Sequence, residues 1–253
     1  MTFAIYPSLS GRTVFVSGGA TGIGADIVRA FARNAARVAF IDVQREAGEA
    51  MAAAVNGAGG TALFLECDVT DIGVLQARIA EARAKLGPIA VLVNNAANDE
   101  RHSVADVTVD YWDHAQNVNL RHHFFAAQTV HPQMRELGHG SIINLSSIAW
   151  RGAAEMPAYS AAKAGILGLT HSLARIFGPD NIRVNAIEPG AVMTDRQRRL
   201  WYKTRASVDA IVQRQSIRTP LIGDAIVGVA LFLAADDSRL LTKQSITVDA
   251  GLR

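Results

Sequence analysis

The sequence predicts one α/β domain, a doubly wound three-layer sandwich around a seven-stranded parallel sheet. Strand-like and helix-like segments alternate from Thr13 to the C-terminus, which is typical of crossover units on a parallel sheet. The expected strands are almost continuously apolar, as they are when helices cover both faces of a sheet. No repeat, low-complexity tract or linker divides residues 1–253, so we expect a single domain.

Seven short, apolar segments rich in β-branched residues are expected to form the strands. They are Thr13–Ser17, Arg37–Asp42, Ala62–Glu66, Ile89–Val93, Ser141–Leu145, Ile182–Ile187 and Ser245–Val248. Five segments between them show helical patterns and should cover the sheet. They are Gly22–Arg33, Arg45–Val55, Ile72–Leu86, Asp110–Met134 and Ala158–Phe177. Residues 194–215 are charged and contain aromatic side chains, and we assign no element to them.

Composition excludes several classes of function. The chain has 25 basic and 23 acidic residues, a formal net charge of +2, and its charges are interspersed, which gives no case for nucleic acid or a membrane surface. The single cysteine, Cys67, makes an internal disulfide and a Cys-based zinc site impossible and fits a reducing compartment. Residues 1–11 lack the apolar core of a signal peptide. The longest uncharged apolar run, 225–235, is well short of the roughly 18 residues that indicate a membrane span. We expect a cytoplasmic protein.

A glycine-rich turn joins the first strand to the first helix. Glycines at this place let the backbone approach a pyrophosphate, and the helix N-terminus supplies free N–H groups. The turn therefore predicts a dinucleotide site, although many glycine turns are merely tight. The residues expected to contact the dinucleotide here are Gly18, Thr21, Gly22, Ile23 and Gly24.

Asp42 ends the second strand, where an acid can accept hydrogen bonds from the adenosine ribose and repel a 2′-phosphate. It therefore favours NAD over NADP, although it could simply be an acid in a surface turn, and the nearby Arg45 argues in the other direction. Asp68 and Val69 follow the third strand. Asp68 could hold the adenine amino group or cap the next turn.

Tyr159 and Lys163 are four residues apart on an expected helix, so their side chains share one face. A neighbouring ammonium and a positively charged nicotinamide would both favour the phenolate form of the tyrosine. Tyr159 is thus a candidate general base for an alcohol. Taken alone, however, such a pair is usually an ordinary solvated helix face.

Further motifs accompany this pair in order along the chain. They are Asn94-Asn95-Ala96, Asn119, Ser146-Ser147, Pro189-Gly190 and the terminal Val248-Asp249-Ala250-Gly251. With the glycine turn, this pattern closely resembles the short-chain dehydrogenase/reductase family, from Gly11 to Gly251. The resemblance implies a Rossmann-type sheet, a nicotinamide cofactor and a homotetramer in which the long helices around Asn119 and Tyr159 pair across subunits.

The resemblance also implies roles for individual residues. Tyr159 would be the acid/base, Lys163 would hold the nicotinamide ribose and lower the tyrosine pKa, and Ser147 would bind the reacting oxygen. Ser146 remains an alternative to Ser147. Asn119 would hold a water that relays protons from Lys163. The nicotinamide end would be contacted by Asn95, Pro189, Gly190, Val192 and Thr194.

Loop residues are most similar to those of bacterial sugar dehydrogenases of this family, which oxidise aldoses at C1. The resemblance implies a galacto-configured sugar, D-galactose or L-arabinose, with L-fucose or D-xylose as alternatives. The expected substrate contacts are Asn98, Ser147, Trp150, Tyr159, Arg196 and Trp201. Trp150 could instead be a loop residue held against the core, and the stretch 196–201 a solvated helix. Residues 194–215 could close over the sugar as a lid.

Two other functions remain open. A dehydrogenase or reductase for another carbonyl, such as a 3-oxoacyl thioester or a steroid, would need a longer or more apolar pocket than the polar loop 98–102 indicates. A non-catalytic NAD-binding regulator would be free to lose Tyr159 or Lys163, and both are present. We expect no metal, because the seven histidines have no accompanying carboxylate cluster.

Overall fold

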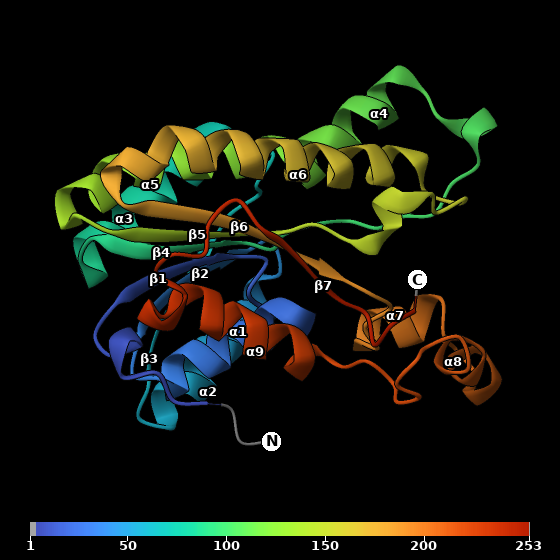
Figure 1. Ribbon diagram of the computed structural model, residues 1–253, viewed down its shortest axis with the longest axis horizontal. Helices are drawn as coiled ribbons and strands as arrows, with labels where there is room; N and C mark the ends of the chain where they lie inside the picture. Colours follow the sequence, from blue (N-terminus) through green and yellow to red (C-terminus); the bar gives the residue numbers. More distant parts are fainter. Residues whose placement is uncertain (1–3, 253) are drawn as a thin grey trace.

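In the computed structural model, which describes residues 4–252, seven parallel strands form one sheet in the order β3-β2-β1-β4-β5-β6-β7 (Figure 1). Strand order reverses between β1 and β4, the position at which doubly wound sheets open a crevice for a ligand. The strands are β1 Thr13–Ser17, β2 Arg37–Asp42, β3 Thr61–Glu66, β4 Ile89–Asn94, β5 Gly140–Leu145, β6 Ile182–Pro189 and β7 Ser245–Val248.

Helices cover both faces of the sheet and complete the predicted sandwich (Figure 1). One layer consists of α1 Gly22–Arg33, α2 Arg45–Gly57 and α9 Gly223–Ala234. The other consists of α3 Ile72–Leu86, α4 Val109–Gln116, α5 His122–Leu137 and α6 Pro157–Phe177. Alternate residues of β1 pack into opposite layers: Val14 and Val16 join the core with α1 and α9, whereas Phe15 joins the core with α3, α5 and α6. This two-sided burial explains why the strands are so apolar.

The long helix expected over 110–134 is interrupted, so this prediction was wrong in detail. A π-helical turn, Asn117–Arg121, separates α4 from α5. The Asn119 side chain donates to the Ala115 carbonyl oxygen through Nδ2 at 2.9 Å, and thus enters the backbone ladder of the helix. Such an insertion locally widens a helix, and π-turns of this kind are frequent at functional sites.

Three helices lie between β6 and β7, where we assign no element from the sequence. α7 Asp195–Leu200 and α8 Arg205–Val212 stand beyond the carboxyl end of the sheet (Figure 1). They carry a small core of their own, in which Met193 packs with Val208 and Val212. The apolar run 225–235 lies largely within α9, which packs against α1. Across residues 4–252, every helix is too short or too polar to cross a membrane.

Candidate active site

A cavity of 1410 Å³ follows the carboxyl ends of the strands on both sides of the β1–β4 switch. Its wall includes most of the residues that the sequence predicted for cofactor and substrate. They are Gly18, Thr21, Gly22, Ile23, Gly24, Asp42, Asp68, Val69, Asn95, Asn98, Ser147, Tyr159, Lys163, Pro189, Gly190, Val192, Thr194 and Arg196. Asn119, Trp150 and Trp201 lie outside the described residues that form this wall. The structure thus brings together residues from almost the whole length of the chain.

The glycine turn is held close to the end of β4. Gly18 has a φ of +66°, and a Cβ placed there would lie 2.8 Å from the Cα of Ala96. A Cβ on Gly24 would lie 1.9 Å from the carbonyl oxygen of Gly18. Asn95 fastens the turn, because its Nδ2 donates to the carbonyl oxygens of Ser17 and Gly18 at 3.0 and 2.9 Å. Glycine is therefore needed at both positions for the turn to pack this closely against the start of α1 and the end of β4.

The N-terminus of α1 has unused hydrogen-bond donors. Thr21 occupies the N-cap position, yet among the described residues no side chain caps this helix, whereas Thr194 and Thr204 cap α7 and α8. The first N–H groups of a helix have no partner within the helix, and together they attract an anion. Gly22, Ile23 and Gly24 line the cavity at this point. The turn therefore fits a dinucleotide pyrophosphate.

Asp42 lies at the end of β2, on the cavity wall, and is 9% exposed. Its carboxylate accepts hydrogen bonds from the backbone N–H groups of Ala20 and Gln44, both at 3.1 Å. Arg45, the basic residue that could have compensated its charge, pairs with Glu66 and lies outside the described cavity wall. The negative charge near the expected ribose is thus unopposed by Arg45.

Asp68 closes the turn after β3. Its Oδ1 accepts hydrogen bonds from the backbone N–H and the hydroxyl of Thr70, both at 2.8 Å. One carboxylate oxygen of Asp68 therefore caps the turn, which is one of the two roles that the sequence allowed for this residue. Asp68 and the buried Val69 also line the cavity, so a role at the adenine remains a prediction.

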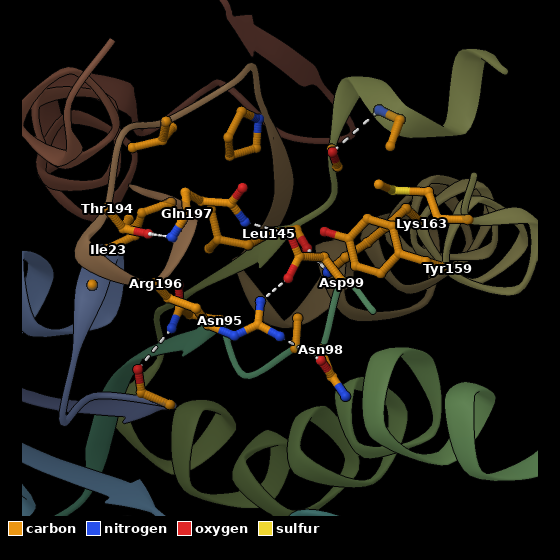
Figure 2. A pocket seen from close by; sticks show the side chains of 18 of the residues that line it. Ile23, Asn95, Asn98, Asp99, Leu145, Tyr159, Lys163, Thr194, Arg196 and Gln197 are labelled. Atoms are coloured by element: carbon orange, nitrogen blue, oxygen red, sulfur yellow. Dashed lines mark hydrogen bonds and ion pairs between the residues drawn. The ribbon is translucent and has the colours of Figure 1, made fainter. Parts of the chain in front are cut away.

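Tyr159 and Lys163 share a face of α6 and point into the cavity (Figure 2). The Lys163 Nζ lies 5.3 Å from the centroid of the Tyr159 ring and donates a hydrogen bond to the Leu145 carbonyl oxygen at 2.7 Å. Lys163 is only 1% exposed. Lys163 is thus buried and Tyr159 is partly buried at the cavity wall, so the pair does not lie on a solvated helix face.

Burial disfavours the charged forms of both side chains. It raises the pKa of Tyr159 to about 12, against the lowering effect of a hydrogen bond with the Ser147 side chain. It lowers the pKa of Lys163 to about 7. Phenolate formation at Tyr159 consequently depends on positive charge brought close to it.

The two adjacent serines have different surroundings. Ser146 is buried, and its hydroxyl donates to the backbone carbonyl oxygen of Lys163 at 2.8 Å, which ties β5 to α6. The hydroxyl of Ser147 lies at the Tyr159 side chain and also accepts a hydrogen bond from the Ala149 N–H at 3.1 Å. This geometry favours Ser147 as the residue that binds a reacting oxygen.

Asn119 is buried within the π-turn behind the cavity. Its side chain pairs twice with the backbone of Asn98: Oδ1 accepts from the N–H at 2.9 Å and Nδ2 donates to the carbonyl oxygen at 3.1 Å. Asn119 thereby positions the loop after β4. A role in a proton relay stays a prediction.

The loop after β4 and helix α7 meet across the cavity (Figure 2). Arg196 donates to Asn98 Oδ1 at 2.8 Å and forms an ion pair with Asp99, and the Gln197 amide donates to the same carboxylate. The two predicted substrate residues are therefore close together but bound to each other. Asp99 adds a second contact between the loop and α7, through Arg196 and Gln197, and we assign it no role from the sequence. Its place in a polar loop beside Asn98 was the only signal in the sequence.

Neither of the two predicted stacking residues, Trp150 and Trp201, is among the described residues that line the cavity. Trp150 donates from Nε1 to Glu188 at 2.6 Å, which matches the alternative of a loop residue held against the core. Trp201 lies against the guanidinium of Arg101, 4.3 Å from the ring centroid. The structure also places Arg151 on the cavity wall and Glu188 behind it, which sequence reasoning missed. An acid at the carboxyl end of β6, a buried strand that also contains Arg183 and Asn185, was the available signal for Glu188.

The described residues contain no cluster of three or more histidine, cysteine or acidic side chains placed to hold a metal ion. The adjacent His122 and His123 are fully buried. Burial lowers the pKa of His122 to about 3 and that of His123 well below its usual range, so both are neutral core residues.

A glycine cradle at the switch point and a tyrosine beside a buried lysine in the same cavity define a nicotinamide-dependent oxidoreductase of doubly wound fold. The family profile described as "Enoyl-(Acyl carrier protein) reductase" matches residues 18–253. The chain belongs to the short-chain dehydrogenase/reductase family.

Two curated relatives are named as sugar dehydrogenases. "Probable galactose dehydrogenase GalD" of Rhizobium meliloti (strain 1021) is 49% identical over 98% of this chain and 97% of its own. "D-xylose 1-dehydrogenase" of Caulobacter vibrioides is 42% identical over the full length of both chains. Among solved structures, a 3-oxoacyl-[acyl-carrier protein] reductase from Brucella melitensis has a TM-score of 0.91 at 30% identity, and covers 98% of this chain and 93% of that chain.

Proposed function

We propose that this protein is an NAD-dependent aldose 1-dehydrogenase, which oxidises the anomeric carbon of an aldose to the aldonolactone. A galacto-configured sugar, D-galactose or L-arabinose, is the proposed substrate, and L-fucose and D-xylose are the alternatives. The observation that carries the proposal is that Tyr159, Ser147 and Lys163 meet in the cavity that also contains the glycine cradle. The two sugar dehydrogenases among the relatives supply the substrate class.

Each catalytic side chain has one task in this reaction. Ser147 donates a hydrogen bond to the anomeric oxygen, and the Tyr159 phenolate removes the proton from that oxygen. Lys163 holds the cofactor ribose and stabilises the phenolate, and Asn119 holds the water that returns protons from Lys163 to solvent. The nicotinamide, when bound, accepts the C1 hydride and its positive charge favours the phenolate.

We propose NAD, and not NADP, because Asp42 is a buried carboxylate at the expected adenosine ribose and the neighbouring cation, Arg45, is paired with Glu66. Ribose hydroxyls can donate to it, whereas a 2′-phosphate would be repelled. The glycine residues and the free N-terminus of α1 hold the pyrophosphate. The nicotinamide end is assigned to Asn95, Pro189, Gly190, Val192 and Thr194, and the adenine end to Asp68 and Val69.

The sugar lies between α6 and α7 in this proposal. Ser147 and Tyr159 contact its C1 end, and Asn98 and Arg196 lie at the opposite wall. Residues 194–215 act as the lid, because Arg196 bridges α7 to the loop after β4. Opening of the lid breaks these contacts and admits the ligands.

We also propose a homotetramer in which α5 and α6 pair with the same helices of another copy. A groove of 330 Å³ lies on these helices and is lined by Leu120, Arg121, Phe124, Phe125, Gly165 and Leu169. Phe124 is 41% exposed there, as is Trp112 on α4. Large exposed apolar side chains indicate an interface. Sedimentation at working concentration tests the assembly, and a monomer would refute it.

NADH formation at mildly alkaline pH, measured with a panel of aldoses and with NAD or NADP, tests the proposed function. Turnover with NAD and one stereochemical set of sugars is expected. The second candidate is reduction of a 3-oxoacyl thioester, which the Brucella melitensis structure favours. Activity with acetoacetyl thioesters and none with any aldose would establish that reaction instead. Cofactor binding without any turnover would indicate the non-catalytic regulator.

A further inference from the structure

Besides Lys163, a buried carboxylate lies near the proposed catalytic residues. Glu188, near the carboxyl end of β6, has a side chain that is 3% exposed. It accepts hydrogen bonds from Trp150 Nε1 at 2.6 Å, from Arg151 Nη2 at 3.0 Å and from the hydroxyl of Ser245. Burial acts to raise the pKa of Glu188, but these hydrogen bonds and the charge of Arg151 outweigh it and hold the pKa below its usual range. Glu188 is therefore an ionised carboxylate with several donors.

Glu188 and Trp150 together fix the side chain of Arg151. The guanidinium carbon lies 4.3 Å from the centroid of the Trp150 ring, and one of its nitrogens is bound to Glu188. An arginine side chain loses much rotamer entropy when it is held in one place, so two independent contacts make the position well defined. Trp150 and Arg151 both belong to the 3₁₀ turn Ile148–Arg151, which follows Ser147 directly.

Arg151 has donors left for a ligand. A guanidinium carries five N–H groups. Among the described residues, Glu188 is the one hydrogen-bond and ion-pair partner of Arg151. The Arg151 side chain is 37% exposed and lines the same cavity as Ser147 and Tyr159. The remaining N–H groups are thus available on the catalytic side of the molecule.

We propose that Arg151 is a specificity residue that donates paired hydrogen bonds to two neighbouring hydroxyls of the aldose ring, and that Glu188 is its positioning residue. The charge of Arg151 is balanced by Glu188, so the pair as a whole suits a neutral substrate with several oxygens. Two adjacent ring hydroxyls match the fork of a guanidinium, which binds paired oxygens. The inference rests on the proposed aldose oxidation and deepens it, because it identifies a residue that selects the stereochemistry.

Substitution of Arg151 separates this role from a structural one. Arg151→Met should raise the KM for the preferred aldose about 10- to 100-fold, the range expected when a charged donor is lost, and leave the KM for NAD within about twofold. Arg151→Lys keeps the charge but lacks the paired N–H groups of the guanidinium, so it should show most of the same rise in the aldose KM. Arg83→Met is the matched control, because Arg83 pairs with Glu136 at 2.7 Å outside the described cavity wall.

Deoxy sugars identify the contact itself. The analogue that lacks the contacted hydroxyl should be a poor substrate for the wild-type enzyme, yet Arg151→Met should handle it as well as the wild type does. With analogues deoxygenated at other positions, Arg151→Met should raise the KM by the same factor as it does with the parent sugar. Equal effects of Arg151→Met on every deoxy sugar would overturn the proposal.

Glu188→Gln tests positioning, since glutamine keeps the size and one acceptor oxygen but not the charge. It should raise the aldose KM in the wild-type background and have no further effect when Arg151→Met is present. The role of Glu188 would be overturned if Glu188→Gln and Arg151→Met raised the aldose KM additively, or if Glu188→Gln raised the KM for NAD as much as the KM for the aldose. If the wild-type protein oxidises no aldose, the proposed function fails and this inference fails with it. If it does and Arg151→Met is unaffected, only the inference fails.

Discussion

The ammonium nitrogen of Lys163 donates a hydrogen bond to the carbonyl oxygen of Leu145 at 2.7 Å. Leu145 is the last residue of β5, and Ser147 follows two residues later. Tyr159 lies one turn before Lys163 on α6. Together with the hydrogen bond from the Ser146 hydroxyl to the Lys163 carbonyl oxygen, this buried contact joins the helix that carries the proposed base to the strand end that carries Ser147. The two bonds set the separation on which the proposed reaction depends.

Removal of the proposed base should abolish most turnover. Tyr159→Phe keeps the ring and its packing but lacks the hydroxyl, so kcat should fall about 10²- to 10⁴-fold. NAD binding, measured by calorimetry, should stay nearly unchanged. Tyr111→Phe is the matched control, because the Tyr111 hydroxyl hydrogen-bonds to His102 Nδ1 at 2.8 Å, away from the catalytic pair. Near-normal turnover of Tyr159→Phe would contradict the assignment.

Substitution of the two adjacent serines should have different effects, on catalysis for Ser147 and on stability for Ser146. Ser147→Ala should lower kcat/KM strongly, because the reacting oxygen loses its donor. Ser146→Ala should retain turnover but lower the free energy of unfolding by about 1–3 kcal/mol, since the buried carbonyl of Lys163 loses its partner. Steady-state kinetics and denaturant unfolding of both variants test this pair. The reverse outcome would assign catalysis to Ser146.

Lys163 should make the stability of the cofactor-free protein depend on pH. Burial lowers its pKa from 10.5 to about 7, so between these values the unfolded chain binds more protons than the folded one. Stability due to this group therefore rises with pH over that interval and is lowest at and below about pH 7. Relative to the wild type, Lys163→Met should be most stable near pH 7 and should lose that advantage towards pH 10. Denaturant unfolding at several pH values measures the difference, and a constant difference would contradict it.

Asp42 should control the choice of cofactor. Asp42→Asn removes the charge that repels a 2′-phosphate while keeping an acceptor for the Ala20 N–H, so the preference for NAD over NADP should shrink about 10-fold or more. Asp71→Asn is a suitable control, because Asp71 caps α3 outside the described cavity wall. Ratios of kcat/KM for NAD and NADP report the effect. An unchanged ratio would show that Asp42 does not determine the preference for NAD over NADP.

The bridge between α7 and the loop after β4 should matter for binding. Arg196→Met loses the contacts to Asn98 and Asp99, so the aldose KM should rise about 10-fold as the lid opens more often. Arg198→Met changes the same helix at an exposed position outside the described wall and should have little effect. Protease sensitivity of residues 194–215 should increase in Arg196→Met alone. Equal behaviour of the two variants would show that the bridge does not hold the lid.

Most of the fold could be predicted because its elements have local signals. The strands are apolar on both faces, and the helices between them show their own periodicity or end at a Gly-Pro pair. The interruption of the helix at Asn119 had no such signal, since it depends on a side chain that bonds to Ala115 and Asn98. α7 and α8 were missed for a related reason: their few apolar residues pack in a small separate core, away from the sheet.

The sequence by itself determined the fold class, the glycine turn and the order of the catalytic motifs, because short-range spacing carries each of them. Only the tertiary structure decided which groups meet. Glu188 binds Arg151 across 37 residues, and Arg196 reaches Asp99 across 97 residues. Such partners depend on how strand ends and loops converge at one edge of the sheet. No local pattern records that convergence, which is why the sequence did not indicate that Arg151 lines the cavity whereas Trp150 and Trp201 do not.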